Sequence, residues 1–400
     1  ALAVWLAALA LISVMTWHAD MASIYMGAHY FARGEFAMIY PPELTLVGET
    51  PQAWLPDLRA MGAADETAYP FVYPPIWAAV VAPLTFVLSA SGFMKVTLVI
   101  QTGLLFGSVW LAYQIAGGFT TFARWSMASV IATLVSVVVS VALTLNQPQI
   151  MLTFFVLLAV KLLLDDRQLA AGALLGVVAA IKLAPVLFIV MLIATKRWRA
   201  ALAMLASIAV LVALSFAICG PTLNADFIAK TRALADYTVS ARLTYNIAPL
   251  LLSVVPQGPQ VVDVIELGGY TAITPVWLRV LAPLLIAALT IGLLAATRNQ
   301  SRETRIVALA VGLSLIIALA GPFGWAHYYL LATLMLPALL DPRFPTWSRW
   351  FFAFALVATS GQVSISAPLI IAQLLPFATF LGVLIFFAVR YDRASFRPLG

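Results

Sequence analysis

The sequence has 400 residues, of which 63% are hydrophobic and 10% are charged, and its mean hydropathy is +1.02. Soluble domains are about 45–50% apolar and about 25% charged, so this composition excludes a soluble globular domain and indicates that the bilayer is the solvent. The net charge of +6 does not indicate a nucleic-acid partner, because the basic residues lie in short segments between apolar runs. Those runs are continuous and not alternating, which predicts an all-α polytopic membrane protein.

Apolar runs between polar breaks predict about 12 transmembrane helices in one domain that covers residues 1–400. The run at the N-terminus is interpreted as a span and not as a signal peptide, because no small-residue cleavage site follows it. The predicted spans lie near residues 1–17, 73–89, 94–116, 125–144, 148–164, 168–195, 199–218, 277–297, 304–320, 325–340, 347–365 and 367–390.

Four short segments contain 11 of the 22 Lys and Arg residues, and strict alternation from a cytoplasmic N-terminus places all four on the inner side. This agreement predicts a multi-pass protein of a bacterial-type plasma membrane. Two longer stretches, residues 18–72 and 219–276, then face outward, and long loops are usually functional. The basic residues are Lys196, Arg197 and Arg199; Arg298, Arg302 and Arg305; Arg343 and Arg349; and Arg390, Arg393 and Arg397.

The first outer loop carries seven of the 16 acidic residues. Its apolar residues from Asp20 onward follow helical spacing, and Gly34 stands where a helix C-terminal glycine belongs. We therefore predict an amphipathic helix at the outer membrane face, with Asp20 as its N-cap. This helix would hold the Asp20 carboxylate at the boundary between membrane and water.

Four motifs follow one another along the chain. The first combines an Asp and a Tyr with small residues, a Gly and a second Tyr, and the second is an aromatic-Tyr-Pro-Pro segment. The third is a polar pair before a Gly-rich helix that ends at Lys and Pro. The fourth is an aromatic segment with one His. They are Asp20, Tyr25, Ala28, Gly34 and Tyr40; Tyr73-Pro74-Pro75; Asn146-Gln147 with Ala171-Gly172, Gly176 and Ile181-Lys182-Leu183-Ala184-Pro185; and Trp325-Ala326-His327-Tyr328-Tyr329.

In this order the motifs resemble the polyprenol-phosphate-sugar-dependent glycosyltransferases of family 87 in the GT-C superfamily, which include mannosyltransferases. The resemblance implies a GT-C-like fold with amphipathic juxtamembrane helices in a periplasmic first loop. It further implies transfer of a sugar, mannose or a pentose, from a polyprenyl-phosphate donor to a lipid or glycan acceptor on the outer face. In the resembled family the first-loop Asp is the base of an inverting displacement, a role that falls on Asp20 here.

Asp20 also has a plainer interpretation, because an Asp at a helix start often only caps the helix. The resemblance favours the catalytic one. A donor on a polyprenyl phosphate already has an activated leaving group, so the enzyme needs a base for the acceptor hydroxyl and cations for the phosphate.

Lys182 lies inside an apolar run, where an unpaired ammonium costs about 2.5–3.5 kcal/mol on insertion scales. Its partner is either a carbonyl freed by the helix break at Pro185 or the donor phosphate. His327 opens a late span, where it is either a packed interfacial residue or a substrate ligand. Asn146 and Gln147 are placed on the inner side by strict alternation, away from Asp20, unless the central helices are short and broken.

Further candidates for binding the donor phosphate or the substrate are Tyr25, Tyr73, Arg242, Arg279 and Asn246. The acidic residues of the first loop show no metal-ligand spacing, and no phosphate-binding loop, dinucleotide turn or zinc motif is present. We therefore expect neither a metal nor another cofactor. Besides the sugar donor and the acceptor, membrane lipids are the expected partners.

Two alternatives come from other classes of protein. A secondary transporter or flippase would use Lys182 and the break at Pro185 as parts of a substrate path, but transporters usually have two similar halves, which this sequence lacks. A scaffold for envelope assembly would not depend on Asp20.

Overall fold

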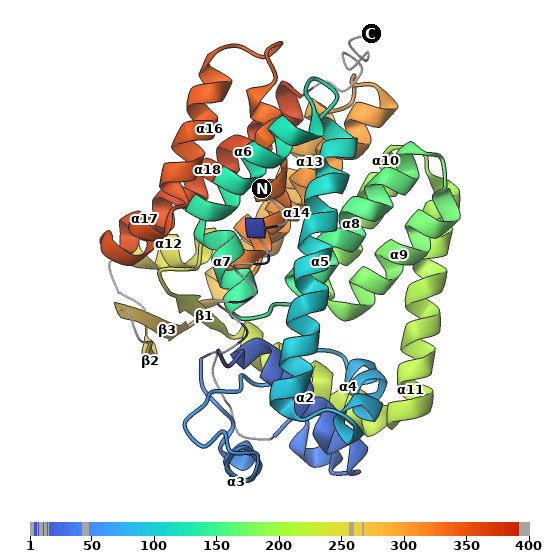
Figure 1. Cartoon of the computed structure of the whole chain (residues 1–400), viewed down its shortest axis with the longest axis vertical. Coiled ribbons are helices and arrows are strands. Elements are labelled where there is room, and N and C mark those ends of the chain that lie inside the picture. The colour runs from blue at the N-terminus through green and yellow to red at the C-terminus, as the bar shows by residue number, and fades with distance from the viewer. Residues whose placement is uncertain are drawn as a thin grey trace.

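The computed structural model describes residues 4–5, 7, 11, 14, 16–41, 48–255, 260–265 and 268–391. The described chain is a helical bundle with short helices at one end and a small sheet at one side (Figure 1). The predicted span near residues 1–17 falls largely outside the described residues.

The elements of the first half are mostly helices, several of them short. They are α2 (Ala19–Ala32), η1 (Phe36–Met38), η2 (Gln52–Trp54), α3 (Leu55–Ala60), α4 (Pro75–Val81), η3 (Ala82–Phe86), α5 (Ala90–Ala116), α6 (Phe122–Val135), α7 (Val137–Thr144), α8 (Gln149–Leu164), α9 (Gln168–Ile181), η4 (Ala184–Leu187), α10 (Phe188–Ala194) and α11 (Trp198–Ala235).

The second half contains the strands. Its elements are β1 (Tyr237–Ser240), α12 (Ile247–Val254), β2 (Val261–Ile265), β3 (Gly269–Ile273), α13 (Val276–Ala296), α14 (Arg302–Ala320), η6 (Ala326–Tyr329), α15 (Leu330–Met335), η7 (Leu336–Leu340), α16 (Trp347–Ala358), α17 (Gly361–Ser366) and α18 (Leu369–Val389).

Within the described residues, five helices are long and apolar enough to cross a membrane, namely α5, α11, α13, α14 and α18. A sixth is added if α7 and α8, which meet at an angle of 118°, are taken as one bent span. The predicted count of 12 is therefore not confirmed. The difference arises because several apolar runs are divided into helices of 10–17 residues, and a helix of that length, at 1.5 Å per residue, is shorter than the hydrocarbon core of about 30 Å.

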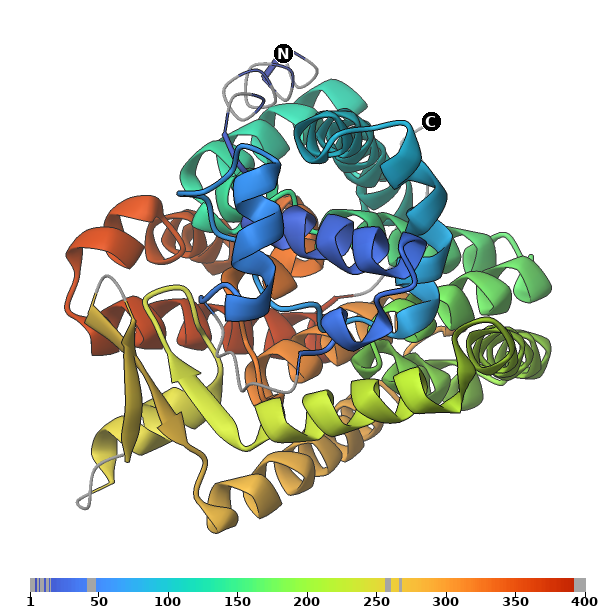
Figure 2. The ribbon, with the colours of Figure 1, turned by 90° about the horizontal axis from the view of Figure 1, so that it is seen from below.

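The basic segments gather at one end of the bundle, which we call the basic end. The Arg305 guanidinium donates a hydrogen bond to the carbonyl of Ala194 (2.9 Å), and the Gln300 amide donates to that of Ala388 (3.1 Å). These bonds join the start of α14 to the ends of α10 and α18. The opposite end contains α2 and α4 and is called the α2 end; Figure 2 shows the molecule from this side.

Residues 168–195, predicted as one span, turn back on themselves. Arg197, which follows α10, pairs with Asp166 and donates to the carbonyl of Leu163 (3.1 Å), so α9 leaves the basic end and α10 returns to it. The turn is at Lys182, whose backbone is extended. Pro185 contributes to the break, because its ring would clash with the carbonyl four residues earlier in a continuous helix.

Residues 73–89, also predicted as a span, form α4 and η3 and remain at the α2 end. Tyr40 donates a hydrogen bond to the carbonyl of Tyr73, and Tyr25 donates to that of Leu88 (3.1 Å), so the first loop holds both ends of this short segment. Helix α5 therefore starts at the α2 end. Residues 90–164 run opposite to the predicted direction, and the hairpin at Lys182 restores the predicted direction from α11 onward.

The first loop forms the predicted helix, as α2, and Gly34 follows it with a φ of 72°. His18, and not Asp20, is the N-cap residue, and Asp20 lies in the first turn. The helix is not the amphipathic surface helix that we predicted, because nine of its 14 residues are buried. It packs under α4 and η3 at the α2 end, where neighbouring segments cover it on several sides (Figure 2).

The second long stretch folds around a kink and a small sheet. Gly220 has a φ of 75° ahead of Pro221, so α11 bends there and its second arm lies across the α2 end (Figure 2). The chain then forms an antiparallel sheet of order β1-β3-β2. This sheet was not predicted and corrects the all-α assignment to a mainly helical fold.

The Gly-rich face of α9 packs directly on α11. A Cβ atom at Gly172 would overlap the carbonyl oxygen of Ala200, and one at Gly176 would lie 2.7 Å from that of Met204. Because a backbone carbonyl cannot move aside as a side chain can, these positions require glycine for close contact between the helices.

We predict that Gly172→Ala destabilises the protein by about 1–3 kcal/mol through overpacking. Gly103→Ala is the matched control, because a Cβ on Gly103 in α5 meets nothing within 4 Å and alanine has the better helix propensity. Thermal unfolding in detergent should show a lower midpoint for Gly172→Ala and an equal or higher one for Gly103→Ala. Equal midpoints for the two variants would contradict the close packing.

Candidate active site

The site is built around Asp20, which α2 presents to the interior of the α2 end. The Gln147 side chain donates a hydrogen bond to the Asp20 carboxylate, and the ammonium of Lys182 lies close enough to act on it electrostatically. His18, which precedes Asp20 in the sequence, anchors the start of α2 by a 2.6 Å hydrogen bond between its Nδ1 and the carbonyl of Thr144. Residues from the first loop and the middle of the chain therefore meet at one point.

Lys182 stands at the turn between α9 and η4. Its Nζ donates a hydrogen bond to Oε1 of Gln149 (3.2 Å) and lies 4.4 Å from the centroid of the Tyr328 ring. An ammonium over an aromatic face gains a favourable cation–π interaction. These contacts, and not a carbonyl freed near Pro185, are the partners that the structure shows for this charge.

The break between α7 and α8 supplies both glutamines. Asn146 has a φ of 52°, and its side-chain amide donates to the carbonyl of Met94 (2.9 Å) while its Oδ1 accepts from Gln101 (2.9 Å). These bonds fix the break against the start of α5. The strict alternation that placed Asn146 and Gln147 away from Asp20 was wrong, because the chain turns back here at the α2 end.

Burial raises the pKa of Asp20 from 3.8 to about 7, although the positive charge of Lys182 and the hydrogen bond from Gln147 both lower it. The side chain nevertheless keeps partial solvent exposure. A carboxylate that titrates near neutral pH and remains accessible is suited to proton transfer, because a general base works best when its pKa is close to the working pH.

His327 and two tyrosines complete the surroundings. His327 is buried, packs edge-on against Tyr328 at a centroid distance of 4.8 Å, and lies within electrostatic range of Lys182. Its Nδ1 has no hydrogen-bond partner among the described atoms. Tyr73 and Tyr328 both lie within electrostatic range of Asp20. The structure thus brings Asp20, Lys182, His327 and Tyr73 together.

The other predicted binding residues lie elsewhere. Tyr25 faces a separate pocket of about 430 Å³ that also contains Trp17 and His29. Asn246 is buried, and its amide donates to the carbonyls of Gly321 (3.0 Å) and Pro322 (3.3 Å), so it supports the segment that leads to His327.

The two predicted arginines are engaged with the protein. Arg279 pairs with Asp236 and donates to the carbonyl of Thr274 (2.9 Å), next to the small sheet. Arg242 donates to the carbonyl of Ala367. Neither of these contacts involves a residue of the Asp20 site.

Two acidic residues of the first loop, Asp57 and Glu35, form contacts away from the Asp20 site. Asp57 accepts a hydrogen bond from Tyr30 (2.8 Å), and Arg33 pairs with Glu35 (2.8 Å). In the part of the chain that the structure describes, no group of three or more His, Cys, Asp or Glu side chains is placed to hold a metal ion.

Residues 71–322 match the family model of glycosyltransferase family 87. The chain belongs to this family. The match covers Tyr73, Gln147, Gln149 and Lys182, whereas Asp20 and His327 lie outside it. No curated protein and no solved structure matches the chain.

Family membership, together with the apolar helices, makes this protein a membrane-embedded glycosyltransferase. It acts on a sugar donor and an acceptor in the membrane. The membership favours an enzyme over the transporter and scaffold alternatives, in which the same buried charges would serve transport or only stability.

Sequence reasoning missed Gln149 and the contact of Tyr328 with Lys182, and it set Gln147 aside. The available signal was the polar run Asn146-Gln147-Pro148-Gln149 between two apolar segments. Polar, irregular backbone at membrane depth is tolerated where it is buried in protein or lines a cavity. Such a run therefore indicates a site whether it lies toward the inner or the outer side of the membrane.

We predict that the stability of Asp20→Asn, relative to that of the wild type, increases as the pH rises. The pKa of Asp20 is about 7 in the folded protein, whereas that of an ordinary aspartate is 3.8. Between these values the folded state binds more protons than the unfolded state, so the stability of the wild type falls as pH rises, and the variant lacks this loss. Apparent unfolding midpoints should diverge between about pH 4 and pH 7 and then run parallel. A constant difference across this range would contradict the raised pKa.

Proposed function

We propose that this glycosyltransferase moves one sugar from a polyprenyl-phosphate donor to a hydroxyl of a lipid or glycan acceptor, with Asp20 as the base. The observation that carries the proposal is that a partly accessible Asp20 lies within electrostatic range of the cation of Lys182 inside the bundle. A carboxylate can accept a proton while a cation beside it holds a phosphate, and these are the two requirements of this reaction.

The proposed step is a single displacement. Asp20 takes the proton of the acceptor hydroxyl as the acceptor oxygen bonds to the anomeric carbon, and the bond between that carbon and the phosphate oxygen breaks. The polyprenyl phosphate leaves with the bonding electrons, and the configuration at the anomeric carbon is inverted. In this proposal Lys182 and His327 bind the phosphate, and the proximity of His327 to Lys182 supports this assignment.

The proposed sugar is mannose or a pentose, and the proposed location is a bacterial-type plasma membrane with the α2 end facing outward. The gathering of basic segments at the opposite end supports this orientation, because Lys and Arg are enriched in cytoplasmic loops. A polyprenyl donor suits a site at the edge of the bilayer, since its chain remains in the membrane while its phosphate reaches the protein.

We expect Asp20→Asn to lower turnover by about 10²–10⁴-fold, because it removes the base and keeps the shape of the side chain. Purified protein would be incubated with polyprenyl-phosphate sugars and envelope lipids, and product release would be measured. Asp65→Asn is the matched control, since Asp65 is an exposed carboxylate of the same loop. Full activity of Asp20→Asn would refute the assignment of the base, and failure of every such donor with the wild type would refute the donor class.

The pH dependence gives a separate prediction. Wild-type kcat/KM should rise with pH and level off above about 7, as Asp20 loses its proton. Lys182→Met and Gln147→Leu each remove an interaction that lowers the pKa of Asp20. In both variants the rise of kcat/KM should therefore occur at higher pH. Lys182→Met should also raise the KM for the donor. If kcat/KM rises at the same pH in both variants as in the wild type, the pH dependence does not report the protonation of Asp20.

A further inference from the structure

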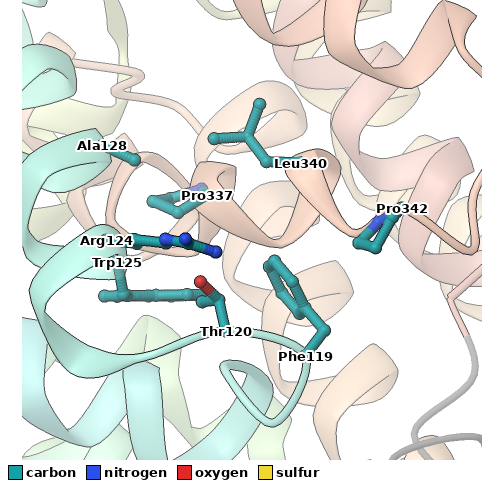
Figure 3. Close-up of a pocket in the computed structure, with 8 residues that line it drawn as sticks. All are labelled: Phe119, Thr120, Arg124, Trp125, Ala128, Pro337, Leu340 and Pro342. Carbon is teal, nitrogen blue, oxygen red and sulfur yellow. The ribbon is translucent and has the colours of Figure 1, made fainter.

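A pocket of about 330 Å³ opens at the basic end, far from Asp20, between the α5–α6 connection and the end of η7 (Figure 3). Its volume is near the lower end of the range of about 300–1,000 Å³ that is usual for small-molecule sites. The lining is mostly apolar, with one hydroxyl and one guanidinium; it consists of Phe119, Thr120, Arg124, Trp125, Ala128, Pro337, Leu340 and Pro342.

Arg124 gives the pocket its charge. Figure 3 shows its guanidinium and the hydroxyl of Thr120 directed into the same space. Within the described ranges Arg124 takes part in no ion pair. The acid beside the pocket, Asp341, is already paired with Arg343, whose Nε lies 2.9 Å from Oδ1 and 3.1 Å from Oδ2. Among the described residues, nothing compensates the positive charge of this pocket.

The helix that carries Arg124 also presents an apolar stripe. Met127, Ile131 and Leu134 have exposed fractions of 66%, 43% and 51%, and together with Arg124 they are spaced three, four and three residues apart. This spacing places them on one face of α6. In a membrane protein such a face lies against lipid chains, so Arg124 stands at the end of a lipid-facing stripe, in the first turn of the helix.

We propose that this pocket binds the phosphate head group of an anionic membrane phospholipid, with the acyl chains along the exposed stripe of α6. The Arg124 guanidinium binds the phosphate oxygens, for which its planar donor fork is well shaped, and the Thr120 hydroxyl donates a further hydrogen bond. Phe119, Pro337 and Leu340 surround the head group with apolar atoms. The site is independent of the sugar-transfer reaction proposed at the other end.

The exposed apolar stripe of α6 favours a phospholipid over a free phosphate ion as the occupant. A free phosphate ion would use only the guanidinium and the hydroxyl, whereas a lipid also covers the apolar face of α6. The position agrees with this choice, because basic pockets between transmembrane helices on the positively charged side commonly hold anionic lipid head groups.

The test uses the purified full chain in detergent, with native mass spectrometry and thermal unfolding in the presence of phosphatidylglycerol, phosphatidylcholine or inorganic phosphate. Three proteins are compared: the wild type, Arg124→Gln and Arg167→Gln. Arg167 is an exposed arginine at the same end and outside the pocket, so its substitution removes an equal charge.

We expect phosphatidylglycerol to bind and stabilise the wild type and Arg167→Gln more than phosphatidylcholine does, and we expect Arg124→Gln to lose affinity about tenfold. Thr120→Val should show a smaller loss. Equal phosphatidylglycerol binding by Arg124→Gln and Arg167→Gln would overturn the proposal. An Arg124-dependent effect of inorganic phosphate as large as that of the lipid would assign the pocket to free phosphate and overturn the lipid as its occupant.

Discussion

The burial of two charged groups, Asp20 and Lys182, near one another inside an apolar bundle is the constraint on which the α2 end depends. Neither charge can be buried alone without a large desolvation cost, so each needs a partner and further polar contacts. Gln147 serves the carboxylate, while Gln149 and the ring of Tyr328 serve the ammonium. The five side chains come from four separate parts of the chain, and their meeting defines the site.

Helix breaks and polar groups occur together for a physical reason. A broken helix exposes backbone N–H and C=O groups, which hydrocarbon cannot satisfy, so breaks are confined to places buried in protein or lining a cavity. The break at Asn146 and the turn at Lys182 both lie in the interior at the α2 end, and the side chains of these turns are the ones that reach Asp20 and Tyr328. The irregular backbone thus positions the polar side chains of the candidate site.

The two ends of the molecule have different electrostatic character. At the α2 end the Asp20 carboxylate lies within electrostatic range of the Lys182 ammonium, and burial raises the pKa of the carboxylate to about 7. At the basic end Arg197 and Arg343 are neutralised by Asp166 and Asp341, whereas Arg124 keeps its charge within the described structure. This asymmetry agrees with the proposed group transfer at one end of the bundle and the proposed binding of a lipid phosphate at the other.

The amino-acid sequence by itself determined that the protein lies in a membrane, that it is mainly helical and that a helix begins near Asp20. It also determined that the basic segments share one end of the bundle and that the chain belongs to its glycosyltransferase family. It also singled out Asp20, Lys182 and His327, because charged residues near apolar runs need a reason to be there. Only the tertiary structure decided which apolar runs cross the bundle. Hydropathy measures whether a segment prefers lipid to water, and a hairpin such as that at Lys182 satisfies this preference as well as a single span does. For that reason the direction of residues 90–164, the contact of Gln147 with Asp20 and the small sheet followed from packing and not from the sequence pattern.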